Sequence, residues 1–113
     1  MAGTLYPVFL IQGVVVAGGT TTHTVVRPLV IIDAGVLATA TNGGATVKVT
    51  TATGDVTEAM VCATDTNVVR AGVVLATTNS AATGSTLSFV GGNGADGIAT
   101  AHVILPASAI PLP

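Results

Sequence analysis

The chain has 113 residues, of which 50% are hydrophobic and 7% are charged; its net charge is -2 and its mean hydropathy is +0.81. Charged residues make up about 25% of an ordinary soluble domain, so this composition is typical of a protein whose surface is covered by neighbours in an assembly. With 3 basic residues, no apolar run of spanning length and no basic amphipathic helix, we expect neither nucleic acid nor a membrane as partner.

Residues 1–20 contain the apolar stretch "LYPVFLIQGVVVAGG". No Lys or Arg precedes it, so the positive lead of a secretion signal is missing. As a strand, it places apolar side chains on both faces and therefore needs cover from both sides. We predict that residues 1–20 form an arm or an edge strand that packs against a neighbouring subunit by strand addition, with Tyr6, Phe9 and Ile11 as candidate contacts.

The next stretch, "TVVRPLVIID", is rich in β-branched residues and is interrupted by Pro28. Because proline cannot donate to a ladder, this break indicates an edge strand or two strands that meet at a bend. Residues 34–56 then read as a hairpin around the turn signal Asn42–Gly44. After that turn the sequence alternates, with Val47 and Val49 on the buried face and Lys48 on the other.

The remaining chain alternates in the same way, between turn signals at 53–55, 64–67, 77–85 and 91–97. On the last strand, His102 shares the outward face with Ile98, Thr100 and Ile104. No stretch keeps a helical period. We therefore predict an all-β fold, an antiparallel, jelly-roll-like β-sandwich over residues 21–106 with an extended tail at 107–113. The inward-facing residues expected on these later strands are Val69, Ala71, Val73, Leu75, Leu87, Phe89, Ala99, Ala101, Val103 and Leu105.

The sequence has no recognisable catalytic motif. His23 and His102 lie in no nucleophile pattern, and we expect partly exposed strand or interface positions for both. Asp55 and Glu58 flank a turn, where solvation is their simplest role. The single cysteine, Cys62, can form no internal disulfide and is expected to be a small buried residue.

One segment matches a metal-binding pattern. "GGNGADGIA", Gly91–Ala99, fits the calcium-binding nonapeptide with Asp96 as its acid, but stacked copies are needed to complete each site. A single copy supplies one carboxylate, whereas calcium takes six to eight oxygens. We therefore expect a glycine-rich loop, with no metal and no cofactor, in a protein that is not an enzyme.

The two arginines, Arg27 and Arg70, both lie in β-rich, mostly apolar stretches. A guanidinium in such surroundings needs a carboxylate or carbonyl groups, within the chain or across an interface. We predict that at least one of them is paired in this way, and both are candidate partner contacts.

Residues 24–106 carry, in order, "VVRPLVIIDAGVL", "GGATVKVTTATGDVTEAMVCATDTNVVRAGVVL", "ATGSTLSF" and "GIATAHVILP". This series resembles small all-β virion proteins of tailed bacteriophages, particularly head decoration (cement) proteins. The resemblance implies a jelly roll or related sandwich, often a homotrimer, on the outer surface of the capsid. There it would clamp subunits of the major capsid protein through repeated weak contacts, with residues 1–20 against a sister subunit or the shell and no catalytic residues.

Other functions stay open at this point. A receptor- or carbohydrate-binding module of a phage fibre is one alternative, although sugar sites usually use Trp or Tyr platforms and this chain has no Trp and one Tyr. A small structural protein of the tail tube or baseplate is another. A small hydrolase has no supporting motif, and 113 residues is short for a major shell protein.

Overall fold

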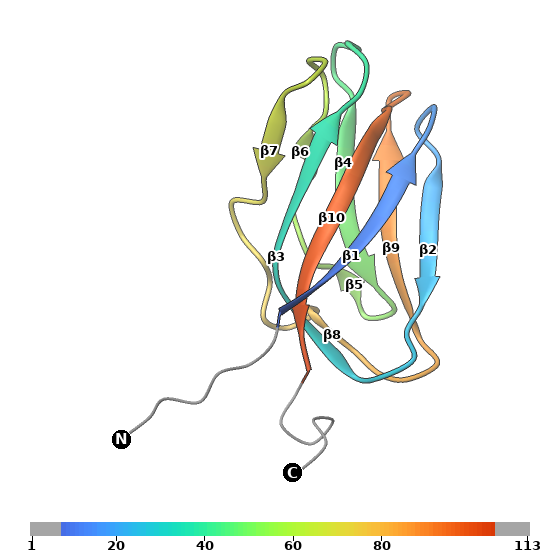
Figure 1. Cartoon of the computed structure of the whole chain (residues 1–113), viewed down its shortest axis with the longest axis vertical. Helices are drawn as coiled ribbons and strands as arrows, with labels where there is room; N and C mark the ends of the chain where they lie inside the picture. Colours follow the sequence, from blue (N-terminus) through green and yellow to red (C-terminus); the bar gives the residue numbers. More distant parts are fainter. Residues whose placement is uncertain (1–7, 106–113) are drawn as a thin grey trace.

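The computed structural model describes residues 8–105, which form ten β-strands and no helix (Figure 1). The strands make two antiparallel sheets that face each other, here called sheet A and sheet B. The predicted all-β antiparallel fold is confirmed. No helix in residues 8–105 has the length and apolar character needed to cross a membrane.

Each sheet has five strands. Sheet A has the order β1-β10-β3-β7, with β8 also on β3; its strands are β1 (Val8–Val15), β10 (Gly97–Ile104), β3 (Leu29–Ala38), β7 (Val68–Arg70) and β8 (Ser80–Ala81). Sheet B has the order β2-β9-β4-β5, with β6 also on β4; its strands are β2 (Thr20–Thr24), β9 (Thr86–Gly92), β4 (Thr46–Thr51), β5 (Gly54–Asp55) and β6 (Met60–Val61).

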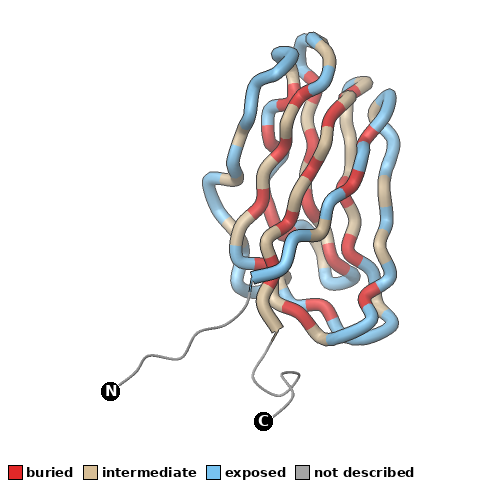
Figure 2. Tube along the Cα trace, in the orientation of Figure 1, coloured by how far each residue is buried: buried red, intermediate tan, exposed pale blue. Residues whose placement is uncertain are grey.

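The core lies between the sheets and follows from the alternation of the strands, since every second side chain points inward. Figure 2 shows this alternation as red segments along the strands of both layers. Phe89 and Leu87 of β9 are fully buried against residues of the opposite sheet. The predicted inward positions that prove to be buried are Val47, Val49, Leu87, Phe89, Ala99, Ala101 and Val103.

The predicted hairpin over residues 34–56 is wrong in its pairing. β3 lies in sheet A and β4 in sheet B, so the chain crosses between the sheets through Asn42–Gly44. Gly44 takes a positive φ of 81°, as the turn signal requires, but β4 pairs with β9 on one side and with β6 and β5 on the other, and not with β3. Pro28 likewise marks a bend, because β2 of sheet B ends before it and β3 of sheet A begins after it.

The strand predicted over 68–76 ends early. β7 stops at Arg70, and Val73 and Leu75 are 59% and 45% exposed rather than inward. The Glu58 carboxylate accepts the backbone N–H groups of Gly72 at 2.6 Å and Val73 at 3.3 Å. These bonds hold the chain away from sheet A at this point, and Val74 packs against the core instead.

The apolar stretch near the start of the chain supplies the edge strand of sheet A. All eight residues of β1 pair with β10, from Val8 opposite Ile104 to Val15 opposite Gly97. Gly13 and Val15 face the core, while Leu10 and Val14 are exposed on the other side. Tyr6 and the predicted tail 107–113 lie outside the described residues.

Candidate functional site

The outward faces of the two sheets differ in their side chains, with more exposed aliphatic residues on sheet A and more hydroxyl groups on sheet B. The face of sheet B is hydroxyl-rich, and Thr22 Oγ1 lies 2.9 Å from Ser88 Oγ across β2 and β9. On the same face Lys48 Nζ lies 3.2 Å from Asp55 Oδ2. Its outward residues on β2, β4 and β9 are Thr20, Thr22, Thr24, Thr46, Lys48, Thr50, Thr86, Ser88 and Val90.

The outward face of sheet A is largely aliphatic and is called here the apolar face. The strand register sets its side chains in rows, because residues directly opposite one another share a face. One row runs from Val14 through Ile98 and Leu37 to Val68. Val14, Leu10 and Val68 are 59%, 65% and 66% exposed. The aliphatic members of the apolar face are Val8, Leu10, Val14, Val30, Ile32, Leu37, Val68, Ile98 and Ile104.

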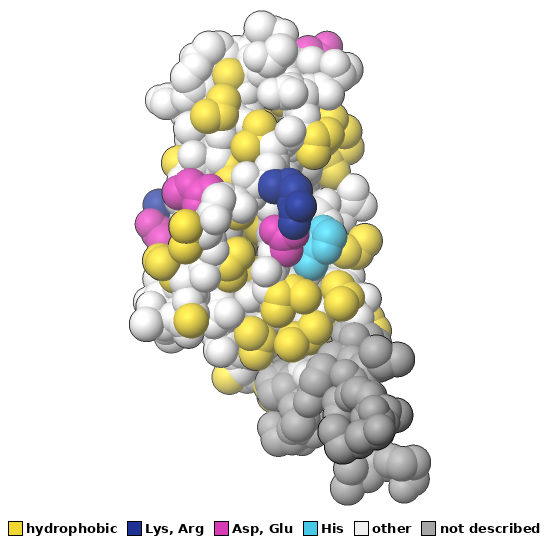
Figure 3. All heavy atoms as spheres, turned by 90° about the vertical axis from the view of Figure 1, so that its left-hand side faces the viewer, with side chains coloured by type: hydrophobic (Ala, Val, Ile, Leu, Met, Phe, Trp, Pro, Cys, Tyr) yellow, Lys and Arg dark blue, Asp and Glu magenta, His cyan; other side chains and the backbone are white. Residues whose placement is uncertain are grey.

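A polar cluster crosses this apolar face. The Arg70 guanidinium donates to Asp33 Oδ2, Asp33 Oδ1 accepts the Ala34 N–H at 2.9 Å, and His102 lies opposite Asp33 on β10. The β3–β10 register shifts directly after this pair, so that Ile32 and Asp33 are both outside the core. Figure 3 shows the blue, magenta and cyan side chains together, with hydrophobic side chains around them.

The electrostatics of the cluster favour a charged Asp33. Burial by itself raises the pKa of this carboxyl group, but the hydrogen bond and the charge of Arg70, the Ala34 N–H and the charge of His102 together bring the pKa below its ordinary value. The pairing of Arg70 confirms the prediction that at least one arginine has an acidic partner. Its span of 37 residues explains why the sequence pattern did not identify that partner.

The chemistry of the cluster suits recognition. Both carboxylate oxygens of Asp33 are already engaged, one by Ala34 and one by Arg70. Within the described part of the chain, no group of three or more His, Cys, Asp or Glu residues is placed to hold a metal ion. An ion pair surrounded by aliphatic side chains offers directional contacts inside a surface that is otherwise largely apolar, and arginine is the charged residue that is enriched at protein interfaces.

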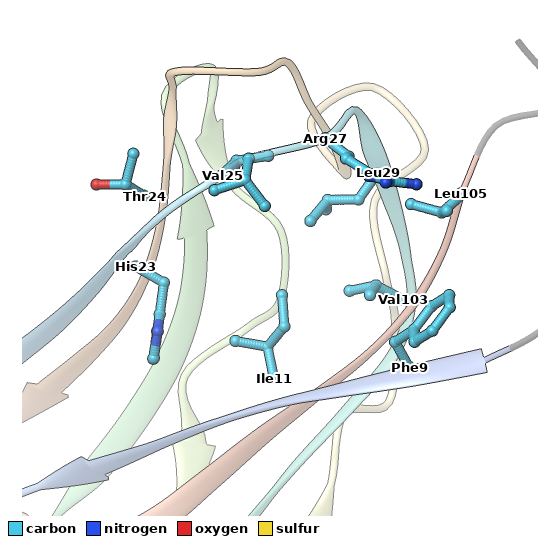
Figure 4. Close-up of a pocket in the computed structure, with 10 residues that line it drawn as sticks. Phe9, Ile11, His23, Thr24, Val25, Arg27, Leu29, Val103 and Leu105 are labelled. Atoms are coloured by element: carbon cyan, nitrogen blue, oxygen red, sulfur yellow. The ribbon is translucent and has the colours of Figure 1, made fainter. Parts of the chain in front are cut away.

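Three of the partner contacts predicted from the sequence lie away from the apolar face, at an apolar cleft of about 390 Å³ at one end of the two sheets. Phe9 and Ile11 reach it from β1, and Arg27 from the connection between β2 and β3 (Figure 4). Arg70 is on the apolar face, so of the five predicted contacts the structure brings three together at the cleft and separates Arg70 from them, while Tyr6 lies outside the described residues. Leu10, Val14 and Val68, which alternate outward on their strands, were not singled out from the sequence.

The glycine-rich segment 91–99 forms the end of β9, a turn at 93–96 and the start of β10, and hydrogen bonds from distant residues fix it. Asn42 Nδ2 donates to the carbonyl groups of Asn93 at 3.0 Å and Gly94 at 2.9 Å. Asp96 Oδ1 accepts the Ala17 N–H at 2.9 Å. These oxygens, which a calcium ion would need as ligands, already accept hydrogen bonds, and Asn42 is a structural residue that the turn signal alone did not reveal.

Two further residues have local structural roles. Cys62 is buried as predicted, and its Sγ lies 3.4 Å from the Asp96 carbonyl oxygen. Burial, together with the negative charge of Asp96, raises the pKa of its thiol. Asp55 and Glu58 do more than the solvation expected as their simplest role, because Asp55 pairs with Lys48 and Glu58 accepts two backbone N–H groups.

Comparisons of this chain with protein-family models, with curated proteins and with solved structures find no match. The function of this chain therefore has to be inferred from its own residues.

Proposed function

We propose that this chain is a non-enzymatic virion structural protein, a decoration or cement protein that binds the outer capsid surface through the apolar face of sheet A. In this role it reinforces contacts between subunits of the major capsid protein. The observation that supports this most directly is the contrast between the two sheets. A protein bound flat on a shell needs one face for the shell and one for water. The outward face of sheet A has the exposed aliphatic side chains, and that of sheet B has the hydroxyl groups.

The composition of the apolar face supports a macromolecular partner. Its most exposed side chains, Leu10 and Val68, lie on the outer strands β1 and β7, so the apolar surface extends across the sheet. Extended exposed apolar surface of this kind marks interaction sites in proteins. The Arg70–Asp33 pair would fix the orientation of the partner, since charged pairs contribute more to specificity than to affinity.

We further propose that the strands have jelly-roll connectivity. In a jelly roll, a long antiparallel ribbon of nested strand pairs is wrapped into two sheets. The pairings of β1 with β10, β2 with β9, β3 with β7 and β4 with β5 have that nested order. The pairings of β10 with β3 and β9 with β4 then join the nested pairs within each sheet. This connectivity supports the resemblance to all-β virion proteins.

Sister subunits are proposed to meet at β1, in a homotrimer. β1 is the edge strand of sheet A, and its side away from β10 has no hydrogen-bonded strand among residues 8–105. Thr21 Oγ1 donates to the Val14 carbonyl oxygen near one end of this eight-residue edge, and the remainder of the edge is a candidate template for strand addition. A structural protein of the tail tube or baseplate would use the same surfaces, so the position of the protein on the particle has to separate these two roles.

The test combines binding with imaging on particles of the phage that encodes this chain. The double variant L10E/V68E places two charges on the apolar face, and T22E/T24E places two on the exposed Thr residues of sheet B as the matched control. We expect the first variant to stay folded by circular dichroism and to lose cosedimentation with heads that lack the protein, while the control binds normally. Electron microscopy of wild-type particles should then show the protein at regular lattice positions on the head.

Equal binding of both variants would contradict the proposed role of the apolar face. Density confined to the tail or baseplate would support the alternative structural role, and density at fibre tips would support a receptor-binding module. Either position would overturn the assignment as a decoration protein.

A further inference from the structure

The apolar cleft opens between β1 of sheet A and the end of β2 in sheet B. Figure 4 shows Ile11 and Val103 of sheet A pointing toward Val25 and Leu29, while Thr24 points away from this space. Its walls are almost entirely hydrophobic, and Val25, Leu29 and Val103 form its buried part. The half-buried Leu105, where the described chain ends, also lines it.

Two polar groups at this cleft have no partner in the described part of the chain. His23 Nε2 is buried and makes no hydrogen bond to residues 8–105, although the ring packs edge-on against Phe89 at a centroid distance of 5.9 Å. Arg27, also at the cleft, makes no ion pair with the carboxylates of the same residues. A guanidinium has only donors to offer, and an imidazole offers one when protonated at that nitrogen. The cleft therefore combines apolar walls with unused hydrogen-bonding groups that suit carbonyl oxygens.

The sequence that follows Leu105, "PASAIPLP", has matching chemistry. Its prolines at 106, 111 and 113 have no N–H group, and prolines favour the extended polyproline II conformation, in which backbone carbonyls are left free. Ile110 and Leu112 supply two large apolar side chains. Proline-containing segments of this kind dock in grooves that offer hydrophobic and aromatic walls and hydrogen-bond donors, as Phe9, Ile11, His23 and Arg27 do here.

We propose that the cleft is a binding site for an extended, proline-containing apolar segment, and that its occupant is residues 106–113 of the same chain, folded back from Leu105. Eight extended residues reach up to about 26–29 Å, so length does not prevent the return. Direct attachment to a residue that lines the cleft gives an effective concentration on the order of millimolar, which lets a weak site be filled within one chain. This site is separate from the apolar face, and the proposed capsid binding does not depend on it.

The test is nuclear magnetic resonance on the full chain, and it uses the presence of two histidines. The variant I110D/L112D adds charges to the proposed anchors, and A107D/S108D adds the same charges nearer Leu105 as the matched control. We expect I110D/L112D to shift the ring signals of His23 and to increase the fluorescence of an apolar dye. His102, on the apolar face, should keep its signals, and the control should match the wild type.

In the wild-type chain, methyl groups of Ile110 and Leu112 should show nuclear Overhauser contacts to those of Ile11 and Val25, at low and high protein concentration alike. This measurement does not depend on whether a variant folds. Absence of these contacts would overturn the proposal, as would His23 signals unchanged in I110D/L112D. Contacts that appear only at high concentration would assign the cleft to the segment of a second copy and would overturn the intramolecular form.

Discussion

At Gly13 the backbone of β1 packs directly against the buried ring of Phe89, and replacing this glycine with alanine tests how tightly the edge strand is packed. A Cβ atom at position 13 would lie 2.6 Å from Phe89 Cδ2, 3.0 Å from Phe89 Cε2 and 3.1 Å from Thr21 Cγ2. Phe89 is fully buried, so its ring has little room to move away. The G13A variant therefore overpacks the core.

Two opposing effects set the size of the change in the free energy of unfolding. Overpacking a well-packed core costs about 1–3 kcal/mol. Alanine in place of glycine within a strand would by itself stabilise the fold by roughly 0.5–1 kcal/mol. The difference between these ranges is a net loss of about 0–2.5 kcal/mol. With the ring of Phe89 held in a closed core we expect a value in the upper half of that range, against the roughly 5–15 kcal/mol that stabilises an ordinary domain.

Urea unfolding followed by circular dichroism measures this loss, and G43A is the matched control because no atom lies within 4 Å of a Cβ at Gly43. The control should change stability by no more than about 0.5 kcal/mol. The F89L substitution makes room beside position 13, so G13A/F89L should be more stable than the sum of the single effects predicts. A G13A variant as stable as G43A, or single effects that add within about 0.5 kcal/mol, would refute the close packing of β1 on Phe89.

Three further predictions concern Glu58, Cys62 and the glycine-rich segment. Hydrogen bonds from the N–H groups of Gly72 and Val73 outweigh burial and hold the pKa of Glu58 below its ordinary value of 4.5. The contribution of Glu58 to stability is therefore present above pH 4.5 and is lost as the pH falls through the folded-state pKa. As the pH is lowered, the urea midpoint should fall less steeply in E58Q than in the wild type, and equal slopes would contradict this. Cys62 should react with a disulfide reagent only as fast as the protein unfolds, because its thiol is buried with a raised pKa; rapid reaction of the native protein would count against this. Calorimetry with calcium should give no micromolar binding signal, since the loop oxygens of Asn93, Gly94 and Asp96 already accept hydrogen bonds, and such a signal would reveal a site at 91–99.

The sequence predicts best where the pattern depends on neighbouring residues. Alternation in β4, β9 and β10 identified Val47, Leu87 and Ala101 as core residues, because successive side chains of a strand point to opposite faces whatever the strand pairs with. It failed after Arg70, where the Glu58 carboxylate binds the backbone from 14 residues away and ends the strand. The residues next to Val73 in the sequence do not indicate that Glu58 binds the backbone there.

The sequence could not assign strands to sheets. Asn42–Gly44 was correctly read as a turn, since glycine tolerates the positive φ that Gly44 adopts. A tight turn between two strands is equally compatible with a hairpin in one sheet and with a crossing between two. The crossing is favoured here by tertiary contacts, in which Asn42 bonds to Ala63 and to the loop at Asn93 and Gly94.

By itself, then, the sequence determined an all-β chain with few charges, with correctly placed turns and with the part of the core that lies on its clearly alternating strands, because these depend on composition and on the two-residue period of a strand. Only the tertiary structure decided which outward residues share a surface. The order β1-β10-β3-β7 sets Leu10, His102, Asp33 and Arg70 side by side on sheet A and gathers the hydroxyl groups on sheet B. That order results from long-range pairing and from packing between the sheets, and no local pattern encodes it.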